Sequence, residues 1–372
     1  MRFSEVLEIK NGKNQRQVEN PNGKYPIYGS GGVMGHADDY LCDAETVVIG
    51  RKGSINNPIF VEEPFWNVDT AFGLVANKDL LLPKYLYYFC INFNFEALNT
   101  TVTIPSLTKA NLLQIEINIP SIAEQSDVVS KLDKIGNLIE LRKQQLEELD
   151  QLVKSRFIEL FGDPETNPRK WPISKLSEFC DLQNGYAFRS EDYLDNSTVL
   201  NCRMSNIRPD GGFDAEYHPK YLPETFWEKY KEYRLIDGDV IIAMTDMASD
   251  PKILGVPTIV RTNGYKFLLN QRVGKLSFYD NSQINNVYLM FVLSQKNIRQ
   301  QLVKSAGGST QINVGKPAIL GVEFFVPPIE LQNQFATFVE QTDKSKFYIE
   351  KFVLSALLIS KITTKIYYNE VS

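Results

Sequence analysis

The chain has 372 residues, more than a single hydrophobic core usually serves, and this length predicts two domains. No apolar run approaches the roughly 18–20 residues of a bilayer span, which argues against a membrane protein, and the N-terminal stretch lacks a signal-peptide core, which predicts a cytoplasmic location. The net charge of −5 argues against a general attraction for nucleic acid, so any DNA-binding surface has to be a local basic patch.

The first distinctive segment is YPIYGSGGVMGHADDYL, which begins at residue 25 and places four glycines within seven residues. A dinucleotide-binding loop needs GxGxxG between a strand and a helix, but here the third glycine position holds Met34 and acidic residues follow. We interpret the segment instead as an exposed backbone scaffold that carries hydrogen-bonding side chains. The candidate binding residues in it are Tyr28, Ser30 and His36.

An apolar strand predicted at residues 46–50 opens into the basic turn GRKGS at 50–54. Two adjacent cations held between glycines suit close approach to phosphate groups or to a guanine edge. A solvated hairpin turn is the alternative interpretation of the same residues. The following segment FWNVDTAF adds polar side chains beside the turn, so the candidates of this region are Arg51, Lys52, Ser54, Asn67 and Thr70.

A long helix is predicted at residues 121–161. Ser121 and Glu124 form a capping box at its start, and Gly162 ends the pattern. Apolar residues recur at three- and four-residue steps with polar residues on the other face, which is typical of a coiled coil. A helix of roughly 40 residues spans about 60 Å. The predicted seam residues are Leu132, Ile135, Ile139, Leu146, Leu149 and Val153.

The second half of the chain repeats the first. FSEVLEIKNGK at 3–13 matches LSEFCDLQNGY at 176–186 with an offset of 173, and TIPSLTKANLLQIEINIPSIAEQ at 103–125 matches TQINVGKPAILGVEFFVPPIELQ at 310–332 with an offset of 207. The growing offset indicates an insertion inside the second copy. A shared frame with unlike interiors indicates one task performed on two different targets, with neutral drift after duplication as the alternative.

A second long helix follows Pro327 and Pro328. Neither helix shows a second apolar face in the sequence, so we predict that the two pair as an antiparallel coiled coil. Packing of each helix on its own domain is the alternative. The predicted seam residues of the second helix are Phe338, Thr342, Ile349, Phe352, Ala356 and Ile359.

The second domain lacks the basic turn, because VIIAMTDMASDPKILG at 240–255 replaces VVIGRKGS. Its candidate binding residues are therefore different, and Gln271 and Arg272, on a predicted strand, could equally be framework. In both domains, the lysine before the long helix, Lys109 or Lys316, either contacts phosphate or belongs to a helix cap. The second-domain candidates are Tyr186, Arg189, Arg203, Asn206, Arg208, Thr245, Gln271, Arg272, Ser309 and Thr310.

The sequence shows no catalytic motif. It has no GxxxxGK[ST] phosphate loop, and NNPIF at 56–60 lacks the second proline of an adenine methyltransferase motif. Four scattered cysteines without a CxxC pair predict free thiols in a reducing compartment, and two isolated histidines disfavour a zinc or iron site. We therefore expect a non-catalytic chain with no cofactor of its own.

The ordered motifs carry a resemblance to a known family. PIYGSGG, VVIGRKGS, FWNVDTAF, YLYYF, TIPSLTKANL, IPSIAEQ and LFGDPETNP, with GDVIIAMTD, LNQRVGKL, GSTQINV and VPPIELQNQF in the second half, resemble the specificity (S) subunit of type I restriction–modification systems. The resemblance covers essentially the whole chain. It implies a mixed α/β fold with two globular target-recognition domains in a pseudo-twofold arrangement, joined by two long antiparallel coiled-coil helices. The expected segments are 1–120 (first domain), 121–161 (first spacer helix), 162–326 (linker and second domain) and 327–372 (second spacer helix).

The resemblance also implies a function. Each domain is expected to recognise one half of a bipartite, asymmetric site in double-stranded DNA, and the helices to set the spacing between the halves. The chain would recruit two methylation subunits, which use S-adenosylmethionine to methylate adenine N6, and restriction subunits, which use ATP and Mg²⁺ to translocate and cleave DNA. Two alternatives are a self-contained restriction–methylation protein or a fragment of one, and a coiled-coil scaffold without DNA readout.

Overall fold

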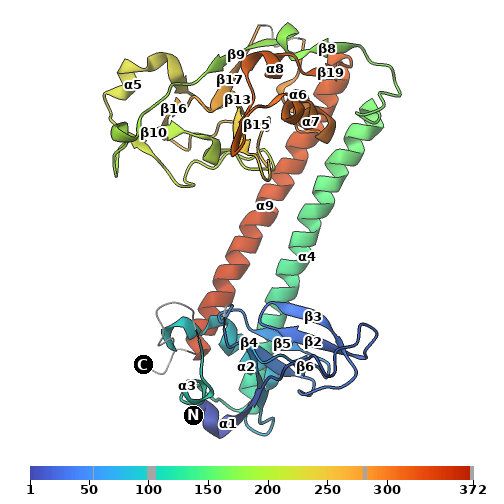
Figure 1. Cartoon of the computed structure of the whole chain (residues 1–372), viewed down its shortest axis with the longest axis vertical. Coiled ribbons are helices and arrows are strands. Elements are labelled where there is room, and N and C mark those ends of the chain that lie inside the picture. The colour runs from blue at the N-terminus through green and yellow to red at the C-terminus, as the bar shows by residue number, and fades with distance from the viewer. Residues whose placement is uncertain (53, 99–105, 280–282, 369–372) are drawn as a thin grey trace. The chain divides into compact units, whose positions relative to one another are not determined.

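The computed structural model describes residues 1–52, 54–98, 106–279 and 283–368, and the chain divides into two compact units (Figure 1). Unit 1 comprises Met1–Glu147 with Phe347–Ser372, and unit 2 comprises Glu148–Lys346. The long helices α4 (Ile122–Phe161) and α9 (Ile329–Tyr368) each contribute a segment to both units. Each unit is therefore a globular domain together with a stretch of paired helix.

The main sheet of unit 1 is antiparallel, with the strand order β1-β7-β4-β5. Every residue of the central strand β4 is buried, because Val47 and Ile49 pack in the core beneath α2 while Val48 packs with Phe65 on the other face. A smaller sheet β3-β2-β6 lies beside it. The elements are α1 (Phe3–Val6), β1 (Leu7–Asn11), β2 (Tyr25–Gly29), β3 (Gly32–Ala37), β4 (Thr46–Gly50), β5 (Ile59–Val61), β6 (Trp66–Asn67), β7 (Ala71–Ala76), α2 (Pro83–Asn92), η1 (Phe95–Leu98) and α3 (Lys109–Leu113).

Unit 2 repeats this frame. Its main sheet has the order β9-β17-β13-β15, again antiparallel, and its strands occupy the places of β1, β7, β4 and β5. The elements are β8 (Ile173–Lys175), η2 (Leu176–Glu178), β9 (Cys180–Asn184), η3 (Ser190–Asp192), β10 (Val199–Cys202), η4 (Met204–Asn206), β11 (Tyr221–Leu222), α5 (Phe226–Lys229), η5 (Lys231–Tyr233), β12 (Arg234–Leu235), β13 (Val240–Ala243), β14 (Thr245–Met247), β15 (Pro257–Ile259), β16 (Lys266–Leu269), β17 (Val273–Phe278), α6 (Asn286–Leu293), α7 (Lys296–Ser305), β18 (Gln311–Asn313), α8 (Lys316–Leu320) and β19 (Glu323–Phe325).

The strand register locates the predicted insertion. Gly50 pairs with Ala71 in unit 1 as Ala243 pairs with Val273 in unit 2, so the offset is 193 at β4 and 202 at β7. Most of the growth from 173 to 207 therefore lies before β13, in the segment that carries β10, β11, α5 and β12. The duplicated frame is confirmed, and the remainder is divided between the loop after β13, where the offset grows from 193 to 202, and the segment after β17, where it grows from 202 to 207.

The repeated Asn-Gly motif marks a close backbone approach in both units. A Cβ on Gly12 would lie 1.8 Å from the carbonyl oxygen of Val68, and a Cβ on Gly185 would lie 2.2 Å from that of Asn270. Any side chain at these positions collides with backbone that has no room to move. Glycine is therefore required at the same place in each copy.

A buried glutamine joins each long helix to its domain. Gln125 of α4 accepts a hydrogen bond from the Leu82 N–H (2.8 Å) and donates to the carbonyl oxygens of Leu80 (2.8 Å) and Pro120 (2.9 Å). Gln332 of α9 likewise accepts from the Asn285 N–H (2.9 Å) and donates to the Pro327 carbonyl (2.8 Å). Both side chains are fully buried. Helix and domain therefore share one hydrogen-bonded core in each unit.

The long helices pair antiparallel in each unit, as predicted. In unit 1 the Arg142 guanidinium lies 5.2 Å from the Phe352 ring centroid, and in unit 2 that of Arg156 lies 5.9 Å from the Phe338 ring. Unit 1 also joins Asn118, just before α4, to the Tyr367 carbonyl near the end of α9 (3.3 Å), and unit 2 also pairs Asp150 with Lys346. Within each unit the residue numbers of α9 therefore fall as those of α4 rise, so the two helices run in opposite directions. Of the predicted seam residues, those buried are Leu132, Ile139, Val153, Thr342, Ile349 and Ala356, and those half-buried are Ile135, Leu146, Leu149 and Phe338.

Two predictions about α9 are wrong. Ile359 is 54% exposed and lies off the seam, which continues through the buried Thr364; Phe352 is also 39% exposed, although it still contacts Arg142. The helix carries a second apolar face as well, because exposed large apolar residues recur at seven- and four-residue steps opposite the seam. That second face made the apolar pattern ambiguous in the sequence, and its residues are Phe347, Leu354, Leu358 and Ile362.

The Asn-Gly positions give a matched stability test. Replacing Gly12→Ala or Gly185→Ala forces a backbone collision and is expected to destabilise the protein by about 1–3 kcal/mol or more. Gly136→Ala, at an exposed α4 position with open space around it, is expected to stabilise by about 0.5–1 kcal/mol through helix propensity. Denaturant unfolding of the three variants measures both. Equal effects at Gly12 and Gly136 would contradict the shared frame.

All four cysteines are free and buried. Burial raises the pKa of the Cys42 thiol to about 11 and that of Cys180 to about 12, and it also raises the pKa of Cys90 and Cys202. We expect no thiol to react with an aromatic disulfide reagent at pH 8 in the native protein and four to react after denaturation. Because unfolded thiols ionise above about pH 8.5, stability should fall as pH rises past that value. Rapid native labelling, or stability that is flat up to pH 10, would contradict this.

Candidate nucleic-acid interface

Three sequence motifs meet at one end of the main sheet in unit 1. The Arg51 N–H donates to the Thr70 carbonyl (2.7 Å), and a Cβ built on Gly50 would lie 2.8 Å from the Ser30 Cβ. The glycine-rich loop, the basic turn and the turn before β7 are therefore adjacent. Arg51, Lys52, Ser54 and Thr70 are exposed and Ser30 is half-buried, while Gly53 lies outside the described residues.

In unit 2, different residues form the corresponding end of the main sheet. The Met244 N–H donates to the Arg272 carbonyl (2.9 Å), and Met244 accepts from the Val314 N–H (2.9 Å) as Arg51 accepts from Leu107 (3.0 Å). Met244 thus occupies the position of Arg51, but its side chain is buried in the core of unit 2. The cationic side chain at this end of the sheet in unit 2 is instead Arg272, the counterpart of Thr70. The two units therefore present different hydrogen-bonding groups on one shared backbone.

Two tyrosines, Tyr186 and Tyr230, form an aromatic pair beside this end of the main sheet in unit 2. The Tyr186 N–H donates to the Leu269 carbonyl (2.9 Å), and Tyr186 accepts from the Gln271 N–H (3.0 Å), which places it beside the turn of Gln271 and Arg272. Gln271 and Arg272 form an exposed turn between β16 and β17, so the prediction of a strand there is wrong. The Tyr186 and Tyr230 rings lie 4.4 Å apart, and a hydrogen bond with Tyr186, reinforced by Lys229, lowers the pKa of Tyr230.

Sequence reasoning missed the unit 1 counterpart of Tyr186. The Asn-Gly repeat aligns Lys13 with it, and the Lys13 N–H donates to the Asn67 carbonyl (2.9 Å), as Tyr186 donates to Leu269. Lys13 is exposed beside the same turn. The signal was present in the repeat, but Lys13 lies outside the basic and glycine-rich motifs that were singled out.

Other predicted binding residues are exposed or half-buried but lie outside the turns at the end of the main sheet. His36, Ser309 and Thr310 are exposed, and Arg189 is exposed and pairs with Glu191 at 3.3 Å. Tyr28 packs edge-on against Phe65, and burial, with a contribution from Glu63, raises its pKa. Two half-buried arginines complete the set: Arg203, and Arg208, whose guanidinium lies 4.6 Å from the Tyr217 ring centroid.

Three predicted binding residues are interior, so their prediction as DNA contacts is wrong. Asn67 is buried and donates to the Ala71 carbonyl (3.2 Å). Asn206 accepts from the Arg203 N–H and donates to the Asp214 carbonyl (both 2.8 Å), and the Thr245 hydroxyl donates to Asn313 Oδ1 (2.6 Å). These side chains stabilise turns and strand ends, so none is available to DNA.

Lys109 and Lys316 also serve the frame. Lys109 Nζ donates to the Ile9 carbonyl (2.7 Å), and Lys316 Nζ lies 2.6 Å from Asp181 Oδ1. Both lysines thus connect α3 or α8 to the first strand of the main sheet. The hydrogen bond from Lys316 lowers the pKa of Asp181. This shared contact explains the repeat at these positions better than phosphate binding does.

The described residues contain neither a metal-binding cluster nor a membrane-spanning helix. Within residues 1–52, 54–98, 106–279 and 283–368, no three His, Cys, Asp or Glu side chains gather as a metal-binding group. Over the same residues, no helix is both long enough and apolar enough for a bilayer crossing.

Comparison with known proteins assigns the frame to a family. The model of the type I restriction modification DNA specificity domain matches residues 1–151 and 168–358. The MjaVIII type I restriction enzyme specificity subunit of Methanocaldococcus jannaschii is 25% identical over 350 residues, which cover 87% of this chain and 77% of the relative. The StySPI specificity subunit of Salmonella potsdam is 23% identical over 330 residues, covering 83% and 69%.

The fold agrees with these matches. A type I restriction–modification S subunit from M. genitalium superposes with a TM-score of 0.62 at 16% identity, covering 100% of this chain and 96% of that one. A second structure, from work on assembly and conformational transition of a type I system, gives 0.57 at 14% identity, covering 100% and 97%. The chain belongs to the family of type I restriction modification DNA specificity domains.

Proposed function

We propose that the two domains of this DNA specificity subunit recognise different halves of one bipartite, asymmetric DNA site. The observation that carries the proposal is the shared position in each unit where Arg51 and Thr70 of one domain are replaced by Met244 and Arg272 of the other. The backbone there is the same and the side chains differ. A common frame with different hydrogen-bonding groups is what recognition of two unlike sequences requires.

The exposed groups suit base-edge and phosphate contacts. An arginine pairs with the O6 and N7 of guanine through two hydrogen bonds, and a lysine binds phosphate as a point charge. In unit 1 these roles fall to Arg51 and Lys52, with Ser30 and Thr70 beside them. In unit 2, Arg272 supplies the guanidinium, and the Gln271 amide matches the N6 and N7 pattern of adenine.

The paired helices would fix the distance between the half-sites. Gln125 and Gln332 attach each helix to its own domain, and the cation–aromatic pairs Arg142–Phe352 and Arg156–Phe338 fix the helix register. A helix of 40 residues is about 60 Å long. The number of helical turns then sets the spacer length in the DNA.

The catalytic steps would belong to partner subunits that dock on the helices. The second apolar face of α9, defined by Phe347, Leu354, Leu358 and Ile362, is an exposed surface of the kind that marks a protein contact. Two methylation subunits would bring S-adenosylmethionine and methylate adenine N6, and restriction subunits would bring ATP and Mg²⁺. With a net charge of −5, this chain would depend on those partners for part of its DNA affinity, and it would act in the cytoplasm.

The basic turn gives the first test. In the assembled complex, Arg51→Ala with Lys52→Ala is expected to cost about 1–3 kcal/mol of binding free energy to the cognate duplex and to reduce the salt slope by about 1. The control removes the same charge from cations already paired with carboxylates, through Lys10→Ala with Lys78→Ala. Its DNA affinity should change little, because these ammonium groups are already neutralised by Asp43 and Glu45 and lie outside the basic turn. Unchanged affinity in the first variant would reject the assignment.

Exchange of residues 1–120 for those of another family member tests whether each domain recognises its own half-site. Methylation-sensitive sequencing of cells that carry the chimaera should show one half of the modified motif replaced and the other half intact. Change in both halves would contradict independent reading by the two domains. Equal affinity for cognate and random duplexes in the parent complex would indicate a scaffold without DNA readout.

A further inference from the structure

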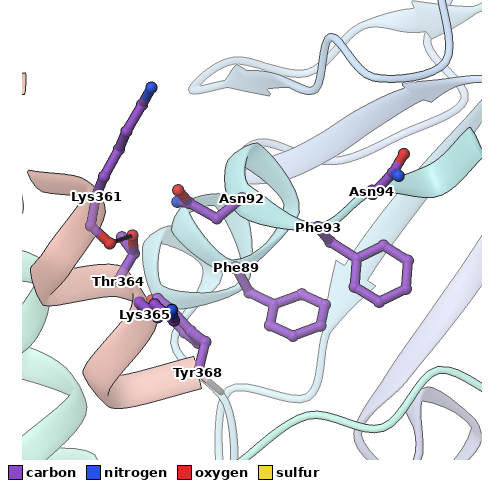
Figure 2. Close-up of a pocket in the computed structure, with 8 residues that line it drawn as sticks. All are labelled: Phe89, Asn92, Phe93, Asn94, Lys361, Thr364, Lys365 and Tyr368. Atoms are coloured by element: carbon purple, nitrogen blue, oxygen red, sulfur yellow. Dashed lines mark hydrogen bonds between the residues drawn. The ribbon is translucent and has the colours of Figure 1, made fainter. Parts of the chain in front are cut away.

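Unit 1 contains a pocket that is separate from the basic turn. It has a volume of about 310 Å³ and lies between the end of α2 and the last turns of α9 (Figure 2). Figure 2 shows α9 contributing Lys361 and Lys365 on one side, and the α2 side contributing two asparagines. The lining residues are Phe89, Asn92, Phe93, Asn94, Lys361, Thr364, Lys365 and Tyr368.

The floor of the pocket is aromatic and fixed. The Phe89 and Phe93 rings stack with centroids 5.4 Å apart, and Tyr368 packs against Phe89 at 5.7 Å. The Tyr368 hydroxyl donates to the Tyr85 carbonyl (3.0 Å), which holds the end of α9 against α2. The pocket is therefore a formed feature of unit 1 rather than a gap between loosely packed helices.

Its rim is cationic, and the described residues place no carboxylate in it. Lys361 and Lys365 are one helical turn apart, and neither pairs with a carboxylate among the residues that the structure describes. The helix dipole favours a cation in the last turn, which accounts for Lys365 but not for Lys361 one turn earlier. Like charges at this spacing repel by a few tenths of a kcal/mol. An external anion would remove that cost.

The rim is connected to the basic turn. Asn94 Oδ1 accepts from Asn56 Nδ2 (3.3 Å), and Asn56 Oδ1 accepts from the Phe95 N–H (2.8 Å). Asn56 follows Ser54 of the basic turn by two residues. The pocket residue Asn94 is therefore hydrogen-bonded to a side chain that lies two residues after the turn that we assign to base and phosphate contacts.

We propose that this pocket binds a backbone phosphate of the DNA next to the half-site recognised by unit 1, with Lys361 and Lys365 as its ligands. Two ammonium groups and asparagine amides, with no carboxylate in the described lining, select an anionic oxygen group. The contact would fasten the end of α9 to the DNA without reading sequence. This inference rests on the proposed function.

The test compares Lys361→Gln/Lys365→Gln with a control, Lys154→Gln/Lys344→Gln, which removes two exposed helix lysines that also have no described ion-pair partner. Each is assembled with its methylation subunits, and binding to cognate and random duplexes is measured from 50 to 200 mM salt. Loss of one phosphate contact should reduce the salt slope by about 0.9 and the affinity about eightfold at 0.1 M salt, by the same factor for both duplexes. The control should match the parent.

Several outcomes would overturn the inference. Unchanged affinity and slope would remove the pocket from the DNA surface, and a loss confined to the cognate duplex would make it a base-reading site. Failure to assemble, seen by size-exclusion chromatography, would make it a subunit contact. Lysine-dependent binding of a free mononucleotide, with DNA affinity unchanged, would assign it to a small ligand. If the parent complex does not prefer its cognate duplex, it is the proposed function that fails.

Discussion

A buried amide at the first turn of each long helix is the contact on which the architecture depends. Without Gln125, the Leu82 N–H would lose its acceptor and two carbonyl oxygens would lose a donor in a core that excludes water, a penalty of about 1–3 kcal/mol for each orphaned group. Gln332 satisfies the Asn285 N–H and the Pro327 carbonyl in the same way in unit 2. Each helix therefore leaves its domain in one direction, and a domain's orientation is tied to the helix that follows it.

The residues that are identical in the two units are those that the backbone geometry requires. Gly12 and Gly185 allow backbones to touch, and Lys109 and Lys316 connect a short helix to the first strand. Residues at the turns differ where the frame places no demand on them. Recognition can diverge there, because a changed side chain at such a turn costs the fold little while it alters what is presented to the DNA.

Much of the fold could be predicted, because residues that the geometry requires are identical in the two repeats and can be recognised in the sequence. The binding site could be predicted only in part. Asn67, Asn206 and Thr245 look like surface polar residues, but short polar side chains also satisfy backbone groups inside turns, and sequence does not distinguish the two uses. Ile359 failed as a seam residue because α9 is apolar on two faces. The helix pairing itself was predicted since each helix needs a partner for its main stripe.

The central claim is that the paired helices hold two different readers at a set separation. Insertion of seven residues into both helices, after Glu147 in α4 and after Lys346 in α9, keeps the heptad seam in register and adds about 10 Å to the coil. Methylation-sensitive sequencing of cells that carry this variant measures the result. The account predicts that both half-site sequences remain and that the spacer between them lengthens by up to about three base pairs, at about 3.4 Å each. Both halves still modified with the original spacer would contradict it.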